Sequence, residues 1–178
     1  MRKSVCTYLV LCFCAFVQAQ NIALKTDLLR DVLTAPQLGA ELTLSNRVTL
    51  ALDVCGAYRP WGKQIHYLAV MPQVRYWLRG RTFANGFVGV KCMADQHDIT
   101  WSGTVYDGET YAAGITAGYD FYLSKHWSLD LSVTAYAAYY HHRQYAVRDA
   151  FFPELTNQYT SGWLCLPDIG FSLVYILK

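Results

Sequence analysis

The sequence predicts an all-β fold, an eight-stranded antiparallel up-and-down transmembrane β-barrel. Three observations lead to this prediction: long segments of strict alternation, regular spacing of short and longer connections, and composition. The chain is 53% hydrophobic and 15% aromatic but only 16% charged. Beyond its N-terminus it has no continuous apolar run of membrane-helix length. This combination is typical of a barrel whose outer face meets lipid.

The clearest alternation lies in residues 110–140, which read as two strands joined by the tight turn Ser124-Lys125-His126. One set of alternate positions in both arms is apolar, and the other set is small or polar. Alternation with a period of two is the pattern of strands that have one apolar and one polar face. The apolar set is Tyr111, Ala113, Ile115, Ala117, Tyr119, Phe121, Leu123, Trp127, Leu129, Leu131, Val133, Ala135, Ala137 and Tyr139.

The same pattern, interrupted by turn residues, divides the rest of the chain into further strands. Pro72 lies inside the fourth strand and predicts a bulge there, because proline cannot donate to the ladder. The predicted strands are 21–29, 37–44, 48–58, 66–78, 86–97, 110–123, 127–140 and 162–178. The predicted short turns are 45–47, 79–85 and 124–126, and the longer connections are 59–65, 98–109 and 141–161, with 30–36 intermediate.

The short turns follow the second, fourth and sixth predicted strands. Every short turn therefore falls at the end of the barrel that holds both termini. Outer-membrane barrels have short periplasmic turns and longer extracellular loops. This agreement predicts that the short turns and both termini are periplasmic.

Residues 1–19 are predicted to be a signal peptide, and residues 20–178 the barrel domain. Met1-Arg2-Lys3 is a basic start, residues 4–17 are apolar, and Val17-Gln18-Ala19 suits cleavage after Ala19. An uncleaved anchor is the alternative, although the apolar run is short for a spanning helix. Removing Arg2 and Lys3 leaves a chain without net charge and without a basic stripe, so no nucleic-acid partner is expected.

Three cysteines remain beyond the predicted signal peptide: Cys55, Cys92 and Cys165. They are odd in number and widely spaced, which matches neither a disulfide framework nor a zinc pattern. We interpret them as small apolar barrel residues, with a bridge between two of them as the alternative.

Alternation alone does not decide whether the apolar face points outward, because a lipocalin-like soluble barrel would bury it. The polar face has few charges, mixed with small residues, which suits a narrow lumen. Aromatic residues of the apolar face also gather near predicted strand ends, as in interfacial girdles. They are Tyr58, Tyr111, Tyr139 and Trp163 near the loop end and Tyr76, Phe121, Trp127 and Tyr175 near the turn end. The expected location is therefore the cell outer membrane, with its lipid as a partner.

The polar face predicts a structural network of charges inside the lumen. Buried charges are costly unless they pair. A three-residue turn places Asp120 opposite Asp130, and two facing carboxylates require a cation. We expect Arg75 or Lys91 to reach this pair. The predicted network is Lys25, Glu41, Asp53, Arg75, Lys91, Asp120 and Asp130, with Asp27 and Asp168 on the same face.

No catalytic, cofactor-binding or metal-binding residue is predicted. The Asp120–Asp130 pair lies in a lumen that looks plugged, and His66 has no matching hydroxyl and acid. His141-His142 and His97-Asp98 lack a spaced third ligand and are read as solvated loop residues. No phosphate-binding loop or nucleophile motif is present. The chain is therefore expected to be neither an enzyme nor a cofactor carrier.

Four segments together resemble one uncharacterised family: NIALKTDLLRDVLTAPQLGAELTLSNR, VRYWLRGR, GITAGYDFYLSKHWSLDLSV and FSLVYIL. It is a domain-of-unknown-function family of outer-membrane β-barrels from anaerobic, host-associated Gram-negative bacteria. The resemblance covers nearly the whole mature chain and implies an outer-membrane location and eight strands, but no activity. Members of such families are sometimes associated with fimbrial or other surface structures. The C-terminus, Ile176-Leu177-Lys178, departs from general barrel practice because it lacks a terminal Phe.

These observations favour a small non-enzymatic outer-membrane barrel with an envelope-structural or surface-interaction role. Its partner would be a surface or periplasmic protein. The alternatives are a narrow pore or small-ligand-binding barrel and, third, an outer-membrane lipid-modifying enzyme centred on His66.

Overall fold

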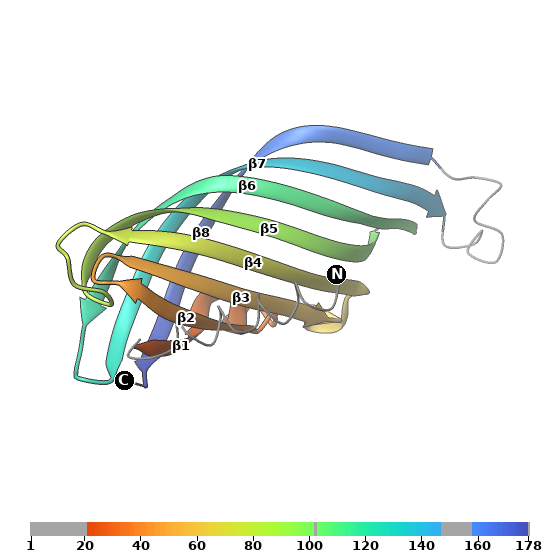
Figure 1. Cartoon of the computed structure of the whole chain (residues 1–178). Helices are drawn as coiled ribbons and strands as arrows, with labels where there is room; N and C mark the ends of the chain where they lie inside the picture. The colour runs from red at the N-terminus through yellow and green to blue at the C-terminus, as the bar shows by residue number, and fades with distance from the viewer. Residues whose placement is uncertain (1–20, 102, 147–157, 178) are drawn as a thin grey trace, which may run out of the picture.

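The computed structural model describes residues 21–101, 103–146 and 158–177 as a closed barrel of eight antiparallel strands. Each strand pairs with its neighbours in the sequence, and β8 returns to pair with β1 (Figure 1). This confirms the predicted eight-stranded up-and-down topology. The predicted signal peptide, residues 1–19, lies outside the described residues.

The strands lengthen along the chain, from β1 with 6 residues to β7 with 20. Two short helical segments, α2 and η1, connect the early strands. The strands are β1 Ile22–Asp27, β2 Gln37–Ser45, β3 Val48–Tyr58, β4 Ile65–Trp77, β5 Asn85–Trp101, β6 Thr104–Tyr122, β7 Trp127–Ala146 and β8 Gln158–Ile176. The helical segments are α2 Leu28–Val32 and η1 Pro60–Gly62. Within the described residues, no helix is long and apolar enough to cross a membrane.

Over the middle of the strands, the outer wall of the barrel is mainly apolar and the lumen contains charged side chains. Along β4, Leu68, Val70 and Val74 are exposed, whereas Met71 and Gln73 are buried. Because alternate side chains of a strand point to opposite faces, this pattern places one set on the outer wall and the other in the lumen. The eight aromatic residues predicted to form girdles are all exposed.

Two predicted long connections are wrong in large part. Residues 98–109 continue β5 and β6, which stay paired up to Trp101 and Thr104 around Gly103 at φ 81°. The glycines and aspartates of this segment resemble turn chemistry, but its Ile, Thr, Val and Tyr residues favour strands once a neighbouring strand is available. The predicted connection 141–161 is likewise strand up to Ala146 and again from Gln158; its middle, 147–157, lies outside the described residues.

The first strand ends earlier than predicted, because α2 begins at Leu28. The Asp27 carboxylate accepts hydrogen bonds from the backbone N–H groups of Leu29 at 3.0 Å and Arg30 at 3.1 Å. This is N-capping, which satisfies donors that a first helical turn otherwise leaves free. The predicted 30–36 loop therefore contains most of a short helix.

Pro72 does not produce the predicted bulge. Val70 pairs with Ala94 and Gln73 with Lys91, so the register is the same on both sides of the proline. Pairing with β5 is interrupted at Met71 and Pro72, while Pro72 still faces Leu52 on β3. The missing donor therefore interrupts the ladder without inserting a residue.

Candidate functional site

The lumen nearest the turn end contains an ion-pair cluster, which we call the lower ion layer: Lys25, Glu41, Asp53, Arg75 and Asp130. The guanidinium of Arg75 contacts the Asp130 carboxylate and lies 3.3 Å from Glu41 Oε2. The Lys25 ammonium lies 3.0 Å from Asp53 and 3.9 Å from Glu41. These side chains are almost completely removed from solvent, Arg75 being 4% exposed.

Uncharged neighbours fix the lower ion layer in position. The Thr49 hydroxyl donates to Glu41 Oε1 at 2.5 Å, and the indole N–H of Trp77 donates to Thr49 at 3.0 Å. The Arg75 guanidinium carbon also lies 4.3 Å from the centre of the Phe87 ring. The cluster is thus held by hydrogen bonds and ring contacts as well as by charge.

Asp120 lies opposite Asp130 in the β6–β7 pairing. The cation that reaches this pair is Arg75, which contacts Asp130 from across the lumen. Asp120 accepts a hydrogen bond from the Ser128 hydroxyl at 3.0 Å and, among the described residues, contacts no cation. The two facing carboxylates are therefore supported by different groups.

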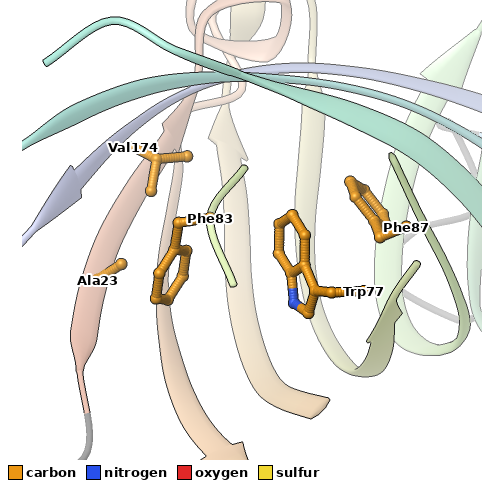
Figure 2. Close-up of a cluster of buried hydrophobic side chains, with 5 residues drawn as sticks. All are labelled: Ala23, Trp77, Phe83, Phe87 and Val174. Atoms are coloured by element: carbon orange, nitrogen blue, oxygen red, sulfur yellow. The ribbon is translucent and has the colours of Figure 1, made fainter. Parts of the chain in front are cut away.

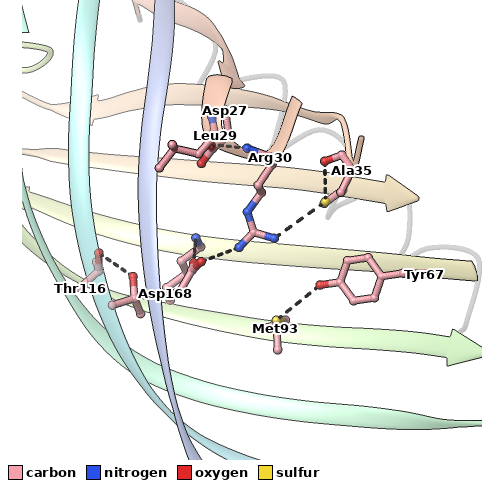
Figure 3. Close-up of polar contacts among 11 residues, drawn as sticks. Asp27, Leu29, Arg30, Ala35, Tyr67, Met93, Thr116 and Asp168 are labelled. Carbon is pink, nitrogen blue, oxygen red and sulfur yellow. Dashed lines mark hydrogen bonds and ion pairs between the residues drawn. The ribbon is translucent and has the colours of Figure 1, made fainter. Parts of the chain in front are cut away.

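Lys91 belongs to a second cluster, the upper ion layer, made of Arg30, Lys91 and Asp168. Asp168 of β8 lies 2.6 Å from Arg30 and 3.3 Å from Lys91 (Figure 3). Arg30 also lies 3.8 Å from the Cys55 sulfur, whose thiol donates to the Ala35 carbonyl at 3.2 Å. Figure 3 shows the Arg30 side chain leaving α2 toward Asp168.

Arg30 is the functional residue that the sequence prediction missed. The sequence pattern places Arg30 in the loop 30–36, whereas α2 carries it into the lumen. The signal for this placement is the capping residue Asp27 followed by the helix-forming Leu28 and Leu29. Strand alternation concealed that signal, because Asp27 and Leu28 also fit the end of a strand.

A cluster of buried apolar residues closes the turn end of the lumen. We call it the aromatic plug: Ala23, Trp77, Phe83, Phe87 and Val174 (Figure 2). Trp77 lies 6.0 Å from Phe83 and 5.1 Å from Phe87, measured between ring centres. Phe83 comes from the turn predicted at 79–85; Phe83 and Ala84 are buried in the barrel, whereas Arg79 and Arg81 of the same turn are exposed.

Polar residues cover both faces of the strands at the loop end. Arg143 donates twice to Asp107, at 2.9 and 2.5 Å, and this carboxylate raises the pKa of Arg143. Burial lowers the pKa of His142, and the nearby His97 and His141 lower it further. His97 lies 2.9 Å from Asp95 through its Nδ1 atom.

The histidines do not converge. His141 stacks on Tyr159 and His142 on Tyr140, because neighbouring residues of β7 face opposite sides of the sheet. His66 stacks on Tyr58. In the part of the chain that the structure describes, no three His, Cys, Asp or Glu side chains are placed to hold a metal ion.

The three cysteines beyond the predicted signal peptide are free. Cys55 is buried in the lumen, whereas Cys92 and Cys165 are exposed on the outer wall. The alternative of a bridge between two of them is therefore wrong.

A comparison with protein families matches residues 5–177 to the model described as protein of unknown function (DUF3575). No curated protein matches the chain significantly. The match covers both ion layers, the aromatic plug and all eight strands. The chain therefore belongs to the DUF3575 family of proteins of unknown function.

Proposed function

We propose that this protein is an outer-membrane barrel with a sealed lumen, and that it is not an enzyme. In this proposal it anchors the long strands β5–β8 at the cell surface, where they contact a surface protein. The observation that carries the proposal is the outer wall, whose side chains change from apolar to charged at the level of the aromatic girdle.

The exposed apolar band has the thickness of a bilayer core. On β6, Tyr111 and Phe121 mark its two borders, with the 73%-exposed Ile115 between them. At about 3.3 Å per residue and a tilt of about 40°, this segment spans about 25 Å along the barrel axis. Outer-membrane barrels have an apolar band about 25 Å tall between aromatic girdles.

Beyond the girdle, the outward side chains become polar, which supports a membrane border at that level. The Tyr111 hydroxyl donates to Glu109 at 2.7 Å, so both side chains lie on the same face. The outward polar residues past the girdle are Gln96, Asp98, Asp107, Glu109, His141 and Arg143.

The lumen supports a sealed barrel over the alternative of a pore. The lower ion layer fills the cross-section above the aromatic plug, and each cation in it contacts two carboxylates. An eight-stranded barrel has an interior just wide enough for side chains to fill. Ions would have to displace Arg75 and Phe83 to pass.

The charged end of β4–β8 supports a surface-interaction role. A cavity of about 520 Å³ there is lined in part by His66, Asp98, Asp107, Arg143 and Tyr159. These five residues are aligned across adjacent strands, so the cavity runs along the sheet as a groove with both signs of charge. Such a groove suits a polar segment of a protein partner.

The location is tested by cell fractionation with a heat-modifiable gel shift. The folded protein is expected in the outer-membrane fraction, and it should migrate differently before and after boiling. Recovery of the mature protein from the soluble periplasm would contradict the proposal.

A matched pair of variants tests the border of the band. Ile115→Arg places a charge in the middle of the band, which costs about 2–4 kcal/mol in a lipid-facing position and should reduce folding into vesicles. Tyr159→Arg places the same charge on an exposed position past the girdle and should fold normally. Equal folding of both variants would mean that Ile115 does not face lipid.

A further inference from the structure

The turn end of the barrel is basic. Its three connections, residues 46–47, 78–84 and 123–126, contain four cationic residues and one histidine but no Asp or Glu. They are Arg47, Arg79, Arg81, Lys125 and His126, and all five side chains are exposed. Because a patch with one sign of charge attracts ligands of the opposite sign, this end of the barrel suits an anion.

Three of these side chains line one hollow of about 300 Å³, which we call the basic hollow: Arg81, Lys125 and His126. Arg81 comes from the turn between β4 and β5, whereas Lys125 and His126 come from the turn between β6 and β7. Asn21 and Tyr122 add neutral hydrogen-bonding groups to the lining. Among the described residues, no carboxylate lines the basic hollow.

The basic hollow lies at the outer side of the aromatic plug. Phe83, which is 3% exposed, lines the hollow and belongs to the plug (Figure 2). The carboxylates of the lower ion layer are buried and contact the cations of that layer. Asp120 is 1% exposed, bonds to Ser128 and does not line the hollow.

The cations of the basic hollow are unpaired, in contrast to those of the lumen. Every cation of the two ion layers contacts a carboxylate. Neither Arg81 nor Lys125 forms an ion pair with any residue that the structure describes. Their charges are therefore available to an anion from outside the chain.

Contacts with the barrel hold the basic groups at the hollow. The guanidinium carbon of Arg81 lies 5.3 Å from the centre of the Tyr122 ring. The Nδ1 atom of His126 lies 3.1 Å from the Ile176 carbonyl oxygen, and the Ile176 backbone N–H donates to the His126 carbonyl at 2.8 Å. Since β8 anchors the β6–β7 turn in this way, the folded barrel sets the positions of the groups around the hollow.

We propose that the basic hollow binds a phosphate group. The planar guanidinium of Arg81 can donate to two phosphate oxygens at once, and the Lys125 ammonium adds a second positive charge. A volume of about 300 Å³ is at the lower end of the range for small-molecule sites. This size suits a phospholipid headgroup or a small phosphate ester.

Two sources of phosphate reach this end of the barrel in the proposed membrane orientation. They are the headgroups of the inner leaflet and phosphate compounds dissolved in the periplasm. Tyr122 is 48% exposed, and Trp127 of the turn-end girdle is 43% exposed. Because tyrosine and tryptophan rings lie at the level of the headgroups, the neighbouring hollow lies near the headgroup phosphates. Only the lipid source rests on the proposed function.

The first test uses inorganic phosphate and the full mature protein folded in dodecyl maltoside micelles, which contain no phosphate. The NMR signals of the Arg81 Nε–H group and of the Lys125 and His126 backbone amides are followed at constant ionic strength. Saturable shifts are expected there and not at Arg79, which lies in the same turn but outside the hollow. Shifts that do not saturate, or that are equal at Arg79, would overturn the proposal, because they report charge screening alone.

Arg81→Gln and Arg79→Gln form a matched pair, since each removes one exposed charge from the same turn. Arg81→Gln should weaken phosphate binding by about tenfold or more, because it removes charge-assisted hydrogen bonds. Arg79→Gln should leave the affinity nearly unchanged, and Lys125→Gln is the second variant of the hollow. Equal losses in the two arginine variants would overturn the proposal. So would acetate binding as tight as that of phosphate, since acetate has a single charge on two oxygens.

Nanodiscs identify the source of the phosphate group. If discs with phosphatidylglycerol shift the Arg81 and Lys125 signals relative to phosphatidylcholine discs and weaken binding of inorganic phosphate, a lipid headgroup occupies the hollow. Unchanged signals with intact phosphate binding assign it to a dissolved compound. A protein that inserts into discs but shows neither effect, and no binding in micelles, disproves the basic hollow alone. A protein that binds phosphate in micelles but never enters a membrane contradicts the proposed function instead.

Discussion

Replacement of Arg75 by Met should strongly destabilise the barrel. Arg75 is 4% exposed and contacts both Asp130 and Glu41. Without it, Asp130 would face Asp120 with no cation in contact, and Glu41 would keep only Lys25 at 3.9 Å. Removing one partner of a buried ion pair leaves an uncompensated charge and costs about 3–5 kcal/mol.

The measurement is a guanidinium titration of the protein folded in vesicles, followed by tryptophan fluorescence in both the unfolding and refolding directions. The double variant Arg75→Met/Asp130→Asn removes both partners of the closest pair and should recover much of the loss. Asp120→Asn is the control: it removes a carboxylate that contacts no cation, so it should be neutral or stabilising by up to about 1 kcal/mol. A cost below about 1 kcal/mol for Arg75→Met would refute the reasoning.

Three further predictions concern conduction, pH and the β4–β5 ladder. Planar bilayers containing the protein should show no channel events, because the aromatic plug and lower ion layer fill the lumen; regular single-channel steps would contradict this. The folded-state pKa of His142 lies below its unfolded value, so its contribution to stability is present above about pH 6.5 and is lost as the pH falls through the folded pKa. Acidification should therefore lower the protection of amides at the loop end of β7 against hydrogen exchange, after correction for the intrinsic pH dependence of exchange, and His142→Gln should remove that loss of protection; an unchanged pH response in this variant would exclude His142 as its cause. Pro72→Ala restores a ladder donor beside Cys92 and should stabilise the barrel by about 1 kcal/mol in the same guanidinium titration; a loss of stability would mean that β4 needs the proline.

Much of the fold could be predicted because the sequence pattern of a barrel strand is simple. Every second side chain faces lipid or lumen, so the alternation in 110–140 fixed the register of β6 and β7. The turn at 124–126 then placed Asp120 opposite Asp130. The strand ends were harder, since Asp98–Glu109 combines turn-forming glycines with strand-forming Val, Thr and Tyr. Only pairing with neighbouring strands resolves that conflict.

The charged residues of the lumen could be predicted as a set, but the ion pairs between them could not. Sequence patterning placed Lys25, Arg75 and Lys91 on the inward face. It did not indicate that Arg75 would reach Asp130 while Lys91 joined Asp168. Those contacts depend on strand tilt and on the distance across the barrel, neither of which is encoded locally.

By itself the sequence determined the class of fold, the strand number, the face of most strand side chains and most charges of the lumen, because all four follow from period-two alternation and turn chemistry. The tertiary structure decided the rest. It placed Arg30 in the upper ion layer, folded Phe83 into the plug and stopped β1 short of most of β8. Each of these depends on the closure of the barrel, which brings together segments that are far apart in the chain. β1 and β2 are short where β8 is long, and this mismatch appears only when the first and last strands meet.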